Sequence, residues 1–209
     1  MKTLYLTAQE VERAAALLAE GKLVAVPTET VYGLAADATQ PEAVWANYEA
    51  KGRPETKPLN VLVDGMEMVE QICRDIPADA YLLAHAFWPG PLTMILWSQG
   101  TLPALVSAGG QTQGVRSPAH PDTLAVIRRL GKPLACPSAN RSGQPSPRTA
   151  QAVAEQLHGD IHAILDGGPC RVGVESTILD LTVHPHRILR LGGLAKWDIE
   201  QLLGEEVLL

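Results

Sequence analysis

Apolar residues recur at helical spacing near the start of the chain. Thr7 and Glu10 have the spacing of a capping box, and Gly21 can end the helix that they begin. One face of this segment carries Val11, Ala14, Ala15 and Leu18. Comparable patterns and turn signals predict further helices over residues 41–50, 78–87, 121–130, 149–157 and 196–203.

Short apolar runs bounded by glycine or proline alternate with these helices. They predict buried strands over residues 23–26, 59–63, 92–97, 134–136, 163–165, 177–181 and 187–191. Interleaved strands and helices are typical of the α/β class. The last two runs stand close together, which favours antiparallel pairing and hence a mixed sheet. We expect a single domain over residues 1–209, built as a twisted mixed sheet flanked by helices.

Charge and composition narrow the function classes. The 209 residues include 17 Lys and Arg against 23 Asp and Glu, a formal net charge of −6, and only 4% aromatic residues. A wholly basic nucleic-acid binder is therefore disfavoured, although a local basic patch is compatible with this balance. Acidic residues appear too early for a signal peptide, and no uncharged apolar stretch is long enough to span a membrane. Three widely spaced cysteines, Cys73, Cys136 and Cys170, favour a reduced environment, so we expect a cytoplasmic protein.

The common signatures of nucleotide, metal and nucleophile sites are missing. The sequence contains no GxxxxGK[ST] loop, no GxGxxG opening a helix, no HExxH and no GxSxG. His184 and His186 stand two residues apart, but no third ligand is near them in sequence. This spacing favours a surface pair over a metal site.

Polar clusters in the breaks between predicted elements carry the remaining chemistry. PTETVYGL (27–34) follows a buried strand, which fits either a capped turn or a pocket wall. KGRPETKPL (51–59) places Lys51, Arg53 and Lys57 within seven residues. A favourable interaction of a cation with the C-terminus of a helix explains Lys51 but not the other two residues, whereas a binding site for a polyanion explains all three.

Three further clusters are weaker when taken alone. TQGVRSP (112–118) presents Arg116 either to a structural partner or to an anion. PSANRSGQPS (137–146) fits an ordinary loop or a loop that wraps a nucleotide, and Ser176 stands where a hairpin could bring it beside Arg190. Together the clusters predict a cationic concave cleft in an acidic protein, which suits an anionic small ligand or an RNA backbone.

The motifs occur in an order that resembles one family. PTETVYGL, KGRPETKPLNVLV, GPLTMIL, TQGVRSP, PLACPSANRSGQPSP, VESTILDL and ILRLGG follow one another as in YrdC/TsaC-type threonylcarbamoyl-AMP synthases. The resemblance covers about residues 8 to 204. It implies a YrdC-like fold and the short form of the family, without the extra C-terminal domain of longer members.

The resemblance also implies a reaction. L-Threonine, bicarbonate or CO2 and ATP would give L-threonylcarbamoyl-AMP and pyrophosphate, with Mg²⁺ held mainly by the ATP phosphates rather than by a protein metal site. Separate transfer proteins would then modify adenosine 37 of tRNA. Such chemistry needs positioning and charge neutralisation but no protein nucleophile.

Residue roles follow from the same resemblance. It implies catalytic cations at Lys51, Arg53 and Lys57. It implies ATP contacts at Arg53, Lys57, Thr112, Ser138, Asn140, Ser146 and Arg190. It implies threonine contacts at Thr30, Arg116 and Ser176. Cys136 stands where relatives often have alanine, and Leu62 where some relatives have a histidine that touches threonine.

Two rival functions fit the same residues. A non-catalytic module could bind tRNA or double-stranded RNA in the cationic cleft, although the acidic net charge counts against this and such binding would weaken steeply with salt. A relative with the same fold could use another carbamoyl substrate, such as carbamoyl phosphate. The joint presence of Thr30, Arg116 and Ser176 favours threonine.

Overall fold

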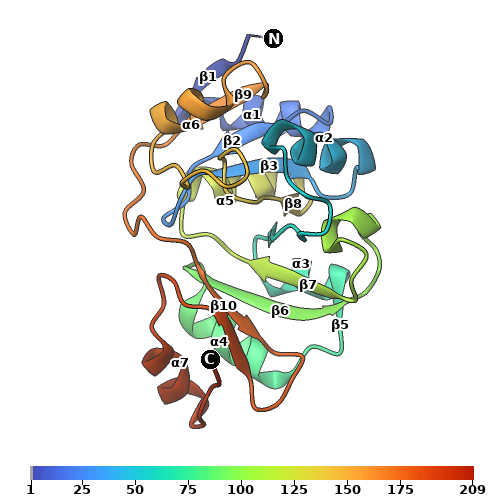
Figure 1. Ribbon diagram of the computed structural model, residues 1–209, viewed down its shortest axis with the longest axis vertical. Coiled ribbons are helices and arrows are strands. Elements are labelled where there is room, and N and C mark those ends of the chain that lie inside the picture. The colour runs from blue at the N-terminus through green and yellow to red at the C-terminus, as the bar shows by residue number, and fades with distance from the viewer. Residues whose placement is uncertain (1) are drawn as a thin grey trace.

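Buried apolar strands pair into one mixed sheet that runs the length of the molecule. The computed structural model describes residues 2–209 and is shown in Figure 1. The strands are β1 (Leu4–Thr7), β2 (Val24–Val26), β3 (Gly33–Asp37), β4 (Val61–Leu62), β5 (Cys73–Arg74), β6 (Leu92–Ser98), β7 (Thr112–Arg116), β8 (Leu134–Ala135), β9 (Ala163–Asp166), β10 (Thr177–Asp180) and β11 (Arg187–Arg190). Their order in the sheet is β1-β9-β2-β3-β8-β4-β7-β6-β10-β11, with β5 paired to β6.

Parallel and antiparallel pairs alternate irregularly across this sheet. β1 with β9, β9 with β2, β4 with β7 and β6 with β10 are parallel, and the remaining neighbours are antiparallel. The predicted antiparallel pairing near the C-terminus is confirmed in β10 and β11, where Leu179 faces Ile188. The expectation of an α/β fold with a mixed sheet is therefore confirmed.

Helices cover both faces of the upper part of the sheet in Figure 1. These upper helices are α1 (Val11–Ala19), α2 (Pro41–Lys51), α5 (Pro121–Leu130) and α6 (Ala150–Leu157). The lower part contains α3 (Met66–Ile72), α4 (Ala78–Phe87) and α7 (Lys196–Leu203), and short 3-10 turns lie at Ala8–Glu10 and Ala104–Ser107. Side chains alternate across a strand, so Val24 and Val26 pack under α1 and α5, whereas Ala25 packs under α2 and α6. This two-sided burial explains why β2 is apolar at every position.

A separate apolar cluster fills the lower part of the molecule. It joins β6, β7 and β10 to α3, α4 and α7 through residues such as Leu83, Met94, Leu179 and Ile199. The polar site described below lies in the strand ends and loops between this cluster and the upper one, so rigid packed elements hold it from both sides.

Five elements were not predicted from the sequence: β1, β3, α3, β5 and β7. In β3, Gly33–Asp37 reads GLAAD, with little β-propensity, but all five residues are buried between neighbouring strands. β7 carries polar Thr112, Gln113 and Arg116, yet it pairs with both β4 and β6. Tertiary contacts, not local preference, make these segments strands. No helix among residues 2–209 combines the length and apolar character that crossing a bilayer requires.

Candidate active site

A polar pocket opens where several strand ends meet the loops beside them. It encloses about 460 Å³, a volume that includes its open mouth. Its walls come from the β2–β3 loop, β4, the end of β7, the loop after β8, the start of β10 and the end of β11. The lining residues are Thr28, Thr30, Val31, Gly33, Asn60, Leu62, Arg116, Cys136, Pro137, Ser138, Glu175, Ser176 and Arg190.

Backbone pairing joins the two loops that form much of the wall. Leu34 N donates to Pro137 O at 2.7 Å, and Ala139 N donates to Tyr32 O at 2.8 Å. Tyr32 N also donates to Pro147 O at 2.9 Å, close to the end of the 137–147 loop. The two polar motifs are therefore fixed to each other by main-chain bonds rather than left as mobile loops.

Arg116 is held in the pocket by a buried ion pair. Its Nη2 lies 3.0 Å from Glu29 Oε2, and both side chains are less than one-tenth exposed. The same Glu29 oxygen accepts a bond from Ala119 N at 3.0 Å. Arg116 Nε is buried without a partner among residues 2–209, and so is Glu29 Oε1. Glu29 thus fixes one edge of the guanidinium, which leaves other N–H groups free for a ligand.

Arg190 and Ser176 meet as the hairpin pattern predicted. Arg190 Nη2 donates to Ser176 O at 2.8 Å and lies 3.3 Å from Ser176 Oγ. Ser176 Oγ and Thr93 Oγ1 are 2.7 Å apart. These contacts set the position of both side chains at the pocket wall.

Glu175 brings a second carboxylate to the pocket. The Ser146 hydroxyl donates to its Oε1 at 2.7 Å. That bond, together with the nearby charges of Arg190 and Arg148, holds the pKa of Glu175 below its usual value, so the group is ionised at neutral pH. Ser146 therefore contacts the pocket through Glu175 and does not itself line it.

Thr30 is oriented by its neighbour Thr28. The Thr28 hydroxyl donates to Val31 O at 2.6 Å and lies 2.9 Å from Thr30 Oγ1. Since the Thr28 proton is used on the carbonyl, Thr30 donates to Thr28 and turns its oxygen lone pairs toward the pocket. An acceptor in this position suits a ligand hydroxyl or ammonium group.

Lys51 and Asn140 organise the loop after β8. The Lys51 ammonium donates to the backbone carbonyls of Ser138 and Asn140, and the Asn140 amide donates to the carbonyls of Arg141 and Gln144. Burial, followed by the nearby charge of Arg53, lowers the pKa of Lys51 to about 7. Ser138, which Lys51 contacts, lies in the pocket lining, so Lys51 acts on the pocket from directly behind its wall.

Arg53 and Lys57 lie in the turn between α2 and β4. Gly52 ends α2 with φ 58°, and Arg53 then donates to Lys57 O at 3.1 Å and to Pro58 O at 2.8 Å. Neither side chain lines the pocket, although the turn leads directly into Asn60, which does. Thr112 stands at the other end of β7, about 13 Å of strand away from Arg116. The structure does not bring Thr112 into this pocket, and its ATP contact stays a prediction.

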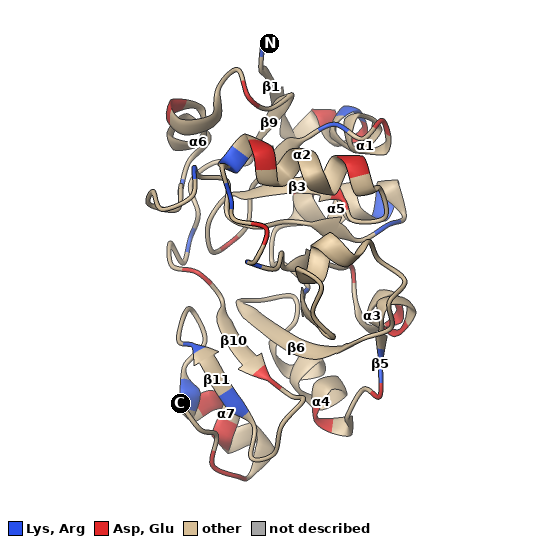
Figure 2. Ribbon diagram, turned by 45° about the vertical axis from the view of Figure 1, so that its right-hand side comes forward, with Lys and Arg blue, Asp and Glu red and all other residues tan. Residues whose placement is uncertain are grey.

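The charge of the pocket is closer to balance than the expected cationic cleft. Arg116 and Arg190 face the site, but Glu29 pairs with the first and Glu175 lies near the second. Figure 2 shows acidic positions interspersed with basic ones over α1, α2 and α7 as well. The cationic character of the cleft therefore stays a prediction.

Comparison with known proteins places the chain in a family. A family model for Sua5, YciO and YrdC proteins, described as "Telomere recombination", matches residues 16–192. The chain belongs to the Sua5/YciO/YrdC family. The resemblance that the ordered motifs indicated is thus confirmed.

Curated relatives and a solved structure support the same assignment. Threonylcarbamoyl-AMP synthases of Pyrococcus abyssi and Bacillus subtilis are 48% and 47% identical over 192 and 196 residues, or 92% and 93% of this chain. The structure of Pyrococcus abyssi Sua5 complexed with L-threonine matches with a TM-score of 0.95 and 44% identity, covering 99% of this chain and 62% of that one. This Sua5/YciO/YrdC chain spans 56% and 57% of the length of those two relatives.

The sequence did not predict two features of this pocket. Asn60, the residue before β4, lines it, and its only sequence signal was a polar residue directly before an apolar run. The Glu29–Arg116 pair joins residues 87 positions apart, and nothing local predicts it. Leu62 and Cys136, singled out as departures from relatives, both line the pocket.

Gly33 gives a test of how tightly the pocket wall is packed. A Cβ on Gly33 would overlap Cys136 Sγ, so Gly33→Ala should destabilise the fold by about 1–3 kcal/mol through overpacking. Cys136→Ala removes that sulfur, and the double variant should recover most of the loss in urea unfolding. Equal destabilisation in the single and double variants would contradict this contact.

Proposed function

We propose that this chain is an L-threonylcarbamoyl-AMP synthase. It joins L-threonine, bicarbonate or CO2 and ATP into L-threonylcarbamoyl-AMP and releases pyrophosphate. Separate transfer proteins then use the adenylate to modify adenosine 37 of tRNA. The observation that carries the proposal is the gathering of Thr30, Arg116, Ser138, Ser176 and Arg190, from five chain segments, around one pocket. The threonine complex of Pyrococcus abyssi Sua5 and the relatives' names support it.

The threonine end of the substrate fits the Arg116 side of the pocket. Glu29 holds one terminal nitrogen of Arg116, so the rest of the fork can donate to the amino-acid carboxylate. Thr30 and Ser176 then offer hydroxyl groups to the threonine side chain. A site that pairs with a substrate hydroxyl disfavours analogues without one, because its own buried polar groups would be left unpaired.

The reaction itself asks for positioning rather than a protein nucleophile. The threonine amine adds to CO2 with loss of a proton and forms a carbamate. A carbamate oxygen attacks the α-phosphorus of ATP, and the bond to pyrophosphate breaks. Lys51, Arg53 and Lys57 stabilise the leaving charge, while Ser138, Asn140, Ser146, Thr112 and Arg190 hold the nucleotide in this proposal. Burial raises the pKa of the Cys136 thiol to about 12, so the pocket sulfur stays neutral.

In the proposed reaction, Mg²⁺ is bound as part of the Mg-ATP substrate. Among residues 2–209, Glu175 is the carboxylate in the pocket lining, and its Oε1 already accepts a bond from Ser146. That donor set does not fit a resident magnesium cage, which takes several oxygen ligands, and it fits an ion carried in on phosphates. Bound to those phosphates, Mg²⁺ neutralises their charge.

Product analysis tests the proposal directly. The chain is incubated with threonine, bicarbonate and Mg-ATP, and L-threonylcarbamoyl-AMP is sought by mass spectrometry alongside pyrophosphate release. We expect this adenylate with threonine and much less of the corresponding product with valine, which lacks the hydroxyl group. Pyrophosphate released equally without threonine, or carbamoyl-AMP formed from carbamoyl phosphate instead, would overturn the proposal. RNA binding that weakens steeply with salt, without any adenylate, would identify an RNA-binding module.

The depressed pKa of Lys51 predicts proton uptake when ATP binds. Near pH 8, a group with a pKa of about 7 is mostly neutral, and the negative charge of a phosphate bound in the pocket, on the other side of the Ser138 wall, raises its pKa toward the ordinary lysine value. ATP binding at pH 8 should therefore take up close to one proton, and uptake should vanish near pH 6, where Lys51 is already charged. Affinity should fall as pH rises above 7. Calorimetry in buffers of different ionisation enthalpy measures the uptake.

Matched lysine variants make that measurement decisive. Lys51→Met should abolish the proton uptake. Lys57→Met, at an exposed position in the turn after α2, should weaken ATP binding but leave the proton uptake unchanged. The same uptake in both variants would show that the titrating group is not Lys51.

A further inference from the structure

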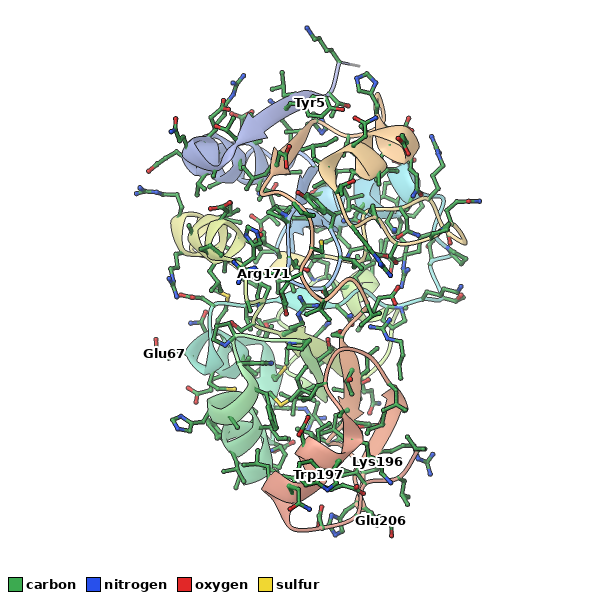
Figure 3. The ribbon with its side chains drawn as sticks, turned by 90° about the vertical axis from the view of Figure 1, so that its left-hand side faces the viewer. Tyr5, Glu67, Arg171, Lys196, Trp197 and Glu206 are labelled. Atoms are coloured by element: carbon green, nitrogen blue, oxygen red, sulfur yellow. The ribbon has the colours of Figure 1, made fainter. Side chains whose placement is uncertain are left out.

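Three segments converge at the end of the molecule opposite the N-terminus. They are the turn between β10 and β11, the chain after α7 and the start of α4. Figure 1 shows the C-terminus beside α4 and α7, and Figure 3 places Glu206 with Lys196 and Trp197 at the same end, far from Tyr5. The proposed active site does not involve this region.

Backbone bonds bring the C-terminal segment onto the turn. Leu208 N donates to His186 O at 2.8 Å, and Ile188 N donates to Leu208 O at 2.7 Å. Val207 is fully buried, and its N–H donates to Glu200 Oε1 at 2.9 Å. These contacts fix Glu205, three residues before Leu208, over the two histidines.

His184, His186 and Glu205 each point one ligand atom at the same point in space. Their three ligand atoms all lie within 4.8 Å of one another. Glu205 Oε1 is 3.8 Å from His184 Nδ1 and 4.0 Å from His186 Nε2. The third ligand that the sequence did not reveal is thus supplied by the fold. The interpretation of His184 and His186 as a surface pair is wrong for His186, which is only 4% exposed.

Both ring nitrogens of His186 have hydrogen-bond partners, and Nε2 is the one that faces Glu205, so a bound ion would replace the contact between Nε2 and Asp79. Nδ1 lies 2.8 Å from Val183 O, and since a carbonyl only accepts, Nδ1 carries a proton. Nε2 then points to carboxylates, with Asp79 Oδ2 at 3.0 Å and Glu205 Oε1 beyond it. A backbone carbonyl on one ring nitrogen and a cation on the other is the usual arrangement of a metal-binding histidine.

Glu205 adds an independent sign of a missing cation. Its Oε1 is buried yet accepts no hydrogen bond from any residue in 2–209. Both histidine nitrogens face that oxygen from beyond hydrogen-bond distance. A buried carboxylate oxygen without a donor is costly, and a metal ion between the three atoms would remove that cost.

We propose that His184, His186 and Glu205 form a binding site for a transition-metal dication of the Zn²⁺ class. Two imidazole nitrogens with one carboxylate select such an ion over Mg²⁺ or Ca²⁺, which prefer oxygen ligands. Tetrahedral zinc places neighbouring ligand atoms about 3.4 Å apart, so the two distances from Glu205 to the histidines need to close by about half an ångström, and the histidine nitrogens, within 4.8 Å of each other, must also approach. Exposed His184, with 71% of its side chain accessible, can make that movement.

The bound ion would act as a clamp on the fold. It would tie the β10–β11 turn to the segment after α7, beside Asp79 at the start of α4. Since β11 carries Arg190 into the pocket at its far end, the clamp would also hold one wall of the proposed active site. Metal binding should therefore stabilise the folded chain, by an amount that rises with the logarithm of the metal concentration above the dissociation constant.

Equilibrium dialysis of the chelator-treated full chain against Zn²⁺, with excess Mg²⁺ present, tests the site. We expect one Zn²⁺ per chain and a melting temperature that rises with Zn²⁺. His184→Ala and Glu205→Gln should each weaken Zn²⁺ binding more than about tenfold and abolish the melting shift. Both positions are partly exposed, so these variants should fold.

Control variants separate the site from adventitious binding. His158→Ala, at an exposed histidine elsewhere on the surface, and Cys170→Ser, at a half-buried thiol, should bind one Zn²⁺ as the unaltered chain does. Equal weakening in His184→Ala and His158→Ala, no saturable binding, or displacement by Mg²⁺ would overturn the proposal. The absence of saturable Zn²⁺ binding is the result expected if His186 only forms an ion pair with Asp79.

Discussion

Replacing Arg116 by alanine raises the threonine concentration for half-maximal rate by roughly 100-fold, because a bidentate charged contact to the carboxylate is lost. The ATP requirement changes little, since Arg116 faces the threonine end of the pocket in the proposed function. Pyrophosphate release with each substrate varied in turn measures both requirements. Equal increases for threonine and ATP would show that this role is wrongly assigned.

A second variant separates this loss from a loss of stability. Removing Arg116 alone leaves the Glu29 carboxylate buried without its partner, at a cost of about 3–5 kcal/mol. Arg116→Ala combined with Glu29→Gln removes the stranded charge and keeps an acceptor for Ala119 N. The double variant should therefore regain much of its stability in urea unfolding while its threonine requirement stays high.

Replacing Arg53 by alanine lowers pyrophosphate release by at least about 100-fold, the scale for removing one group that stabilises developing charge. The structure adds a second reason. Arg53 donates to Lys57 O and Pro58 O, so its loss also frees the turn that leads to Asn60. Lys57→Met removes a neighbouring charge without those bonds and should cost less.

The control for this variant is Arg74→Ala, which removes a half-exposed arginine on β5, away from the pocket. Its activity should stay near that of the unaltered chain. Circular dichroism and melting curves establish whether Arg53→Ala remains folded. A folded Arg53→Ala variant with near-normal pyrophosphate release would show that the cation cluster does not serve the leaving group.

Apolar spacing and turn signals predicted the α-helices of residues 2–209 other than α3, because both signals are local in the sequence. The predicted ranges 78–87, 121–130 and 196–203 coincide with α4, α5 and α7. β3 and β7 were missed because Gly33–Asp37 is small and Thr112–Arg116 is polar, and both become strands only when neighbours pair with them on each side. Local preference carries no information about such partners.

The sequence predicted which residues belong to the candidate site better than it predicted the contacts that those residues make. Thr30, Arg116, Ser138, Ser176 and Arg190 line one pocket, as their motifs indicated together. Which partner each side chain has depends on long-range pairing. The fold alone determines that Arg116 meets Glu29, that Ser146 meets Glu175 and that Lys51 contacts backbone carbonyls rather than facing the pocket.

The edge strand β1 has a consequence for how the chain is made. Leu4 pairs with Ala163, and Thr7 pairs with Asp166, so β1 has no partner until β9, about 160 residues further along the chain, has been synthesised. β9 also supplies one neighbour of β2, so this part of the sheet closes only after that long interval. Until then the edges of β1 and β2 lack a partner strand, and nascent chains with unpaired strand edges are prone to associate with one another.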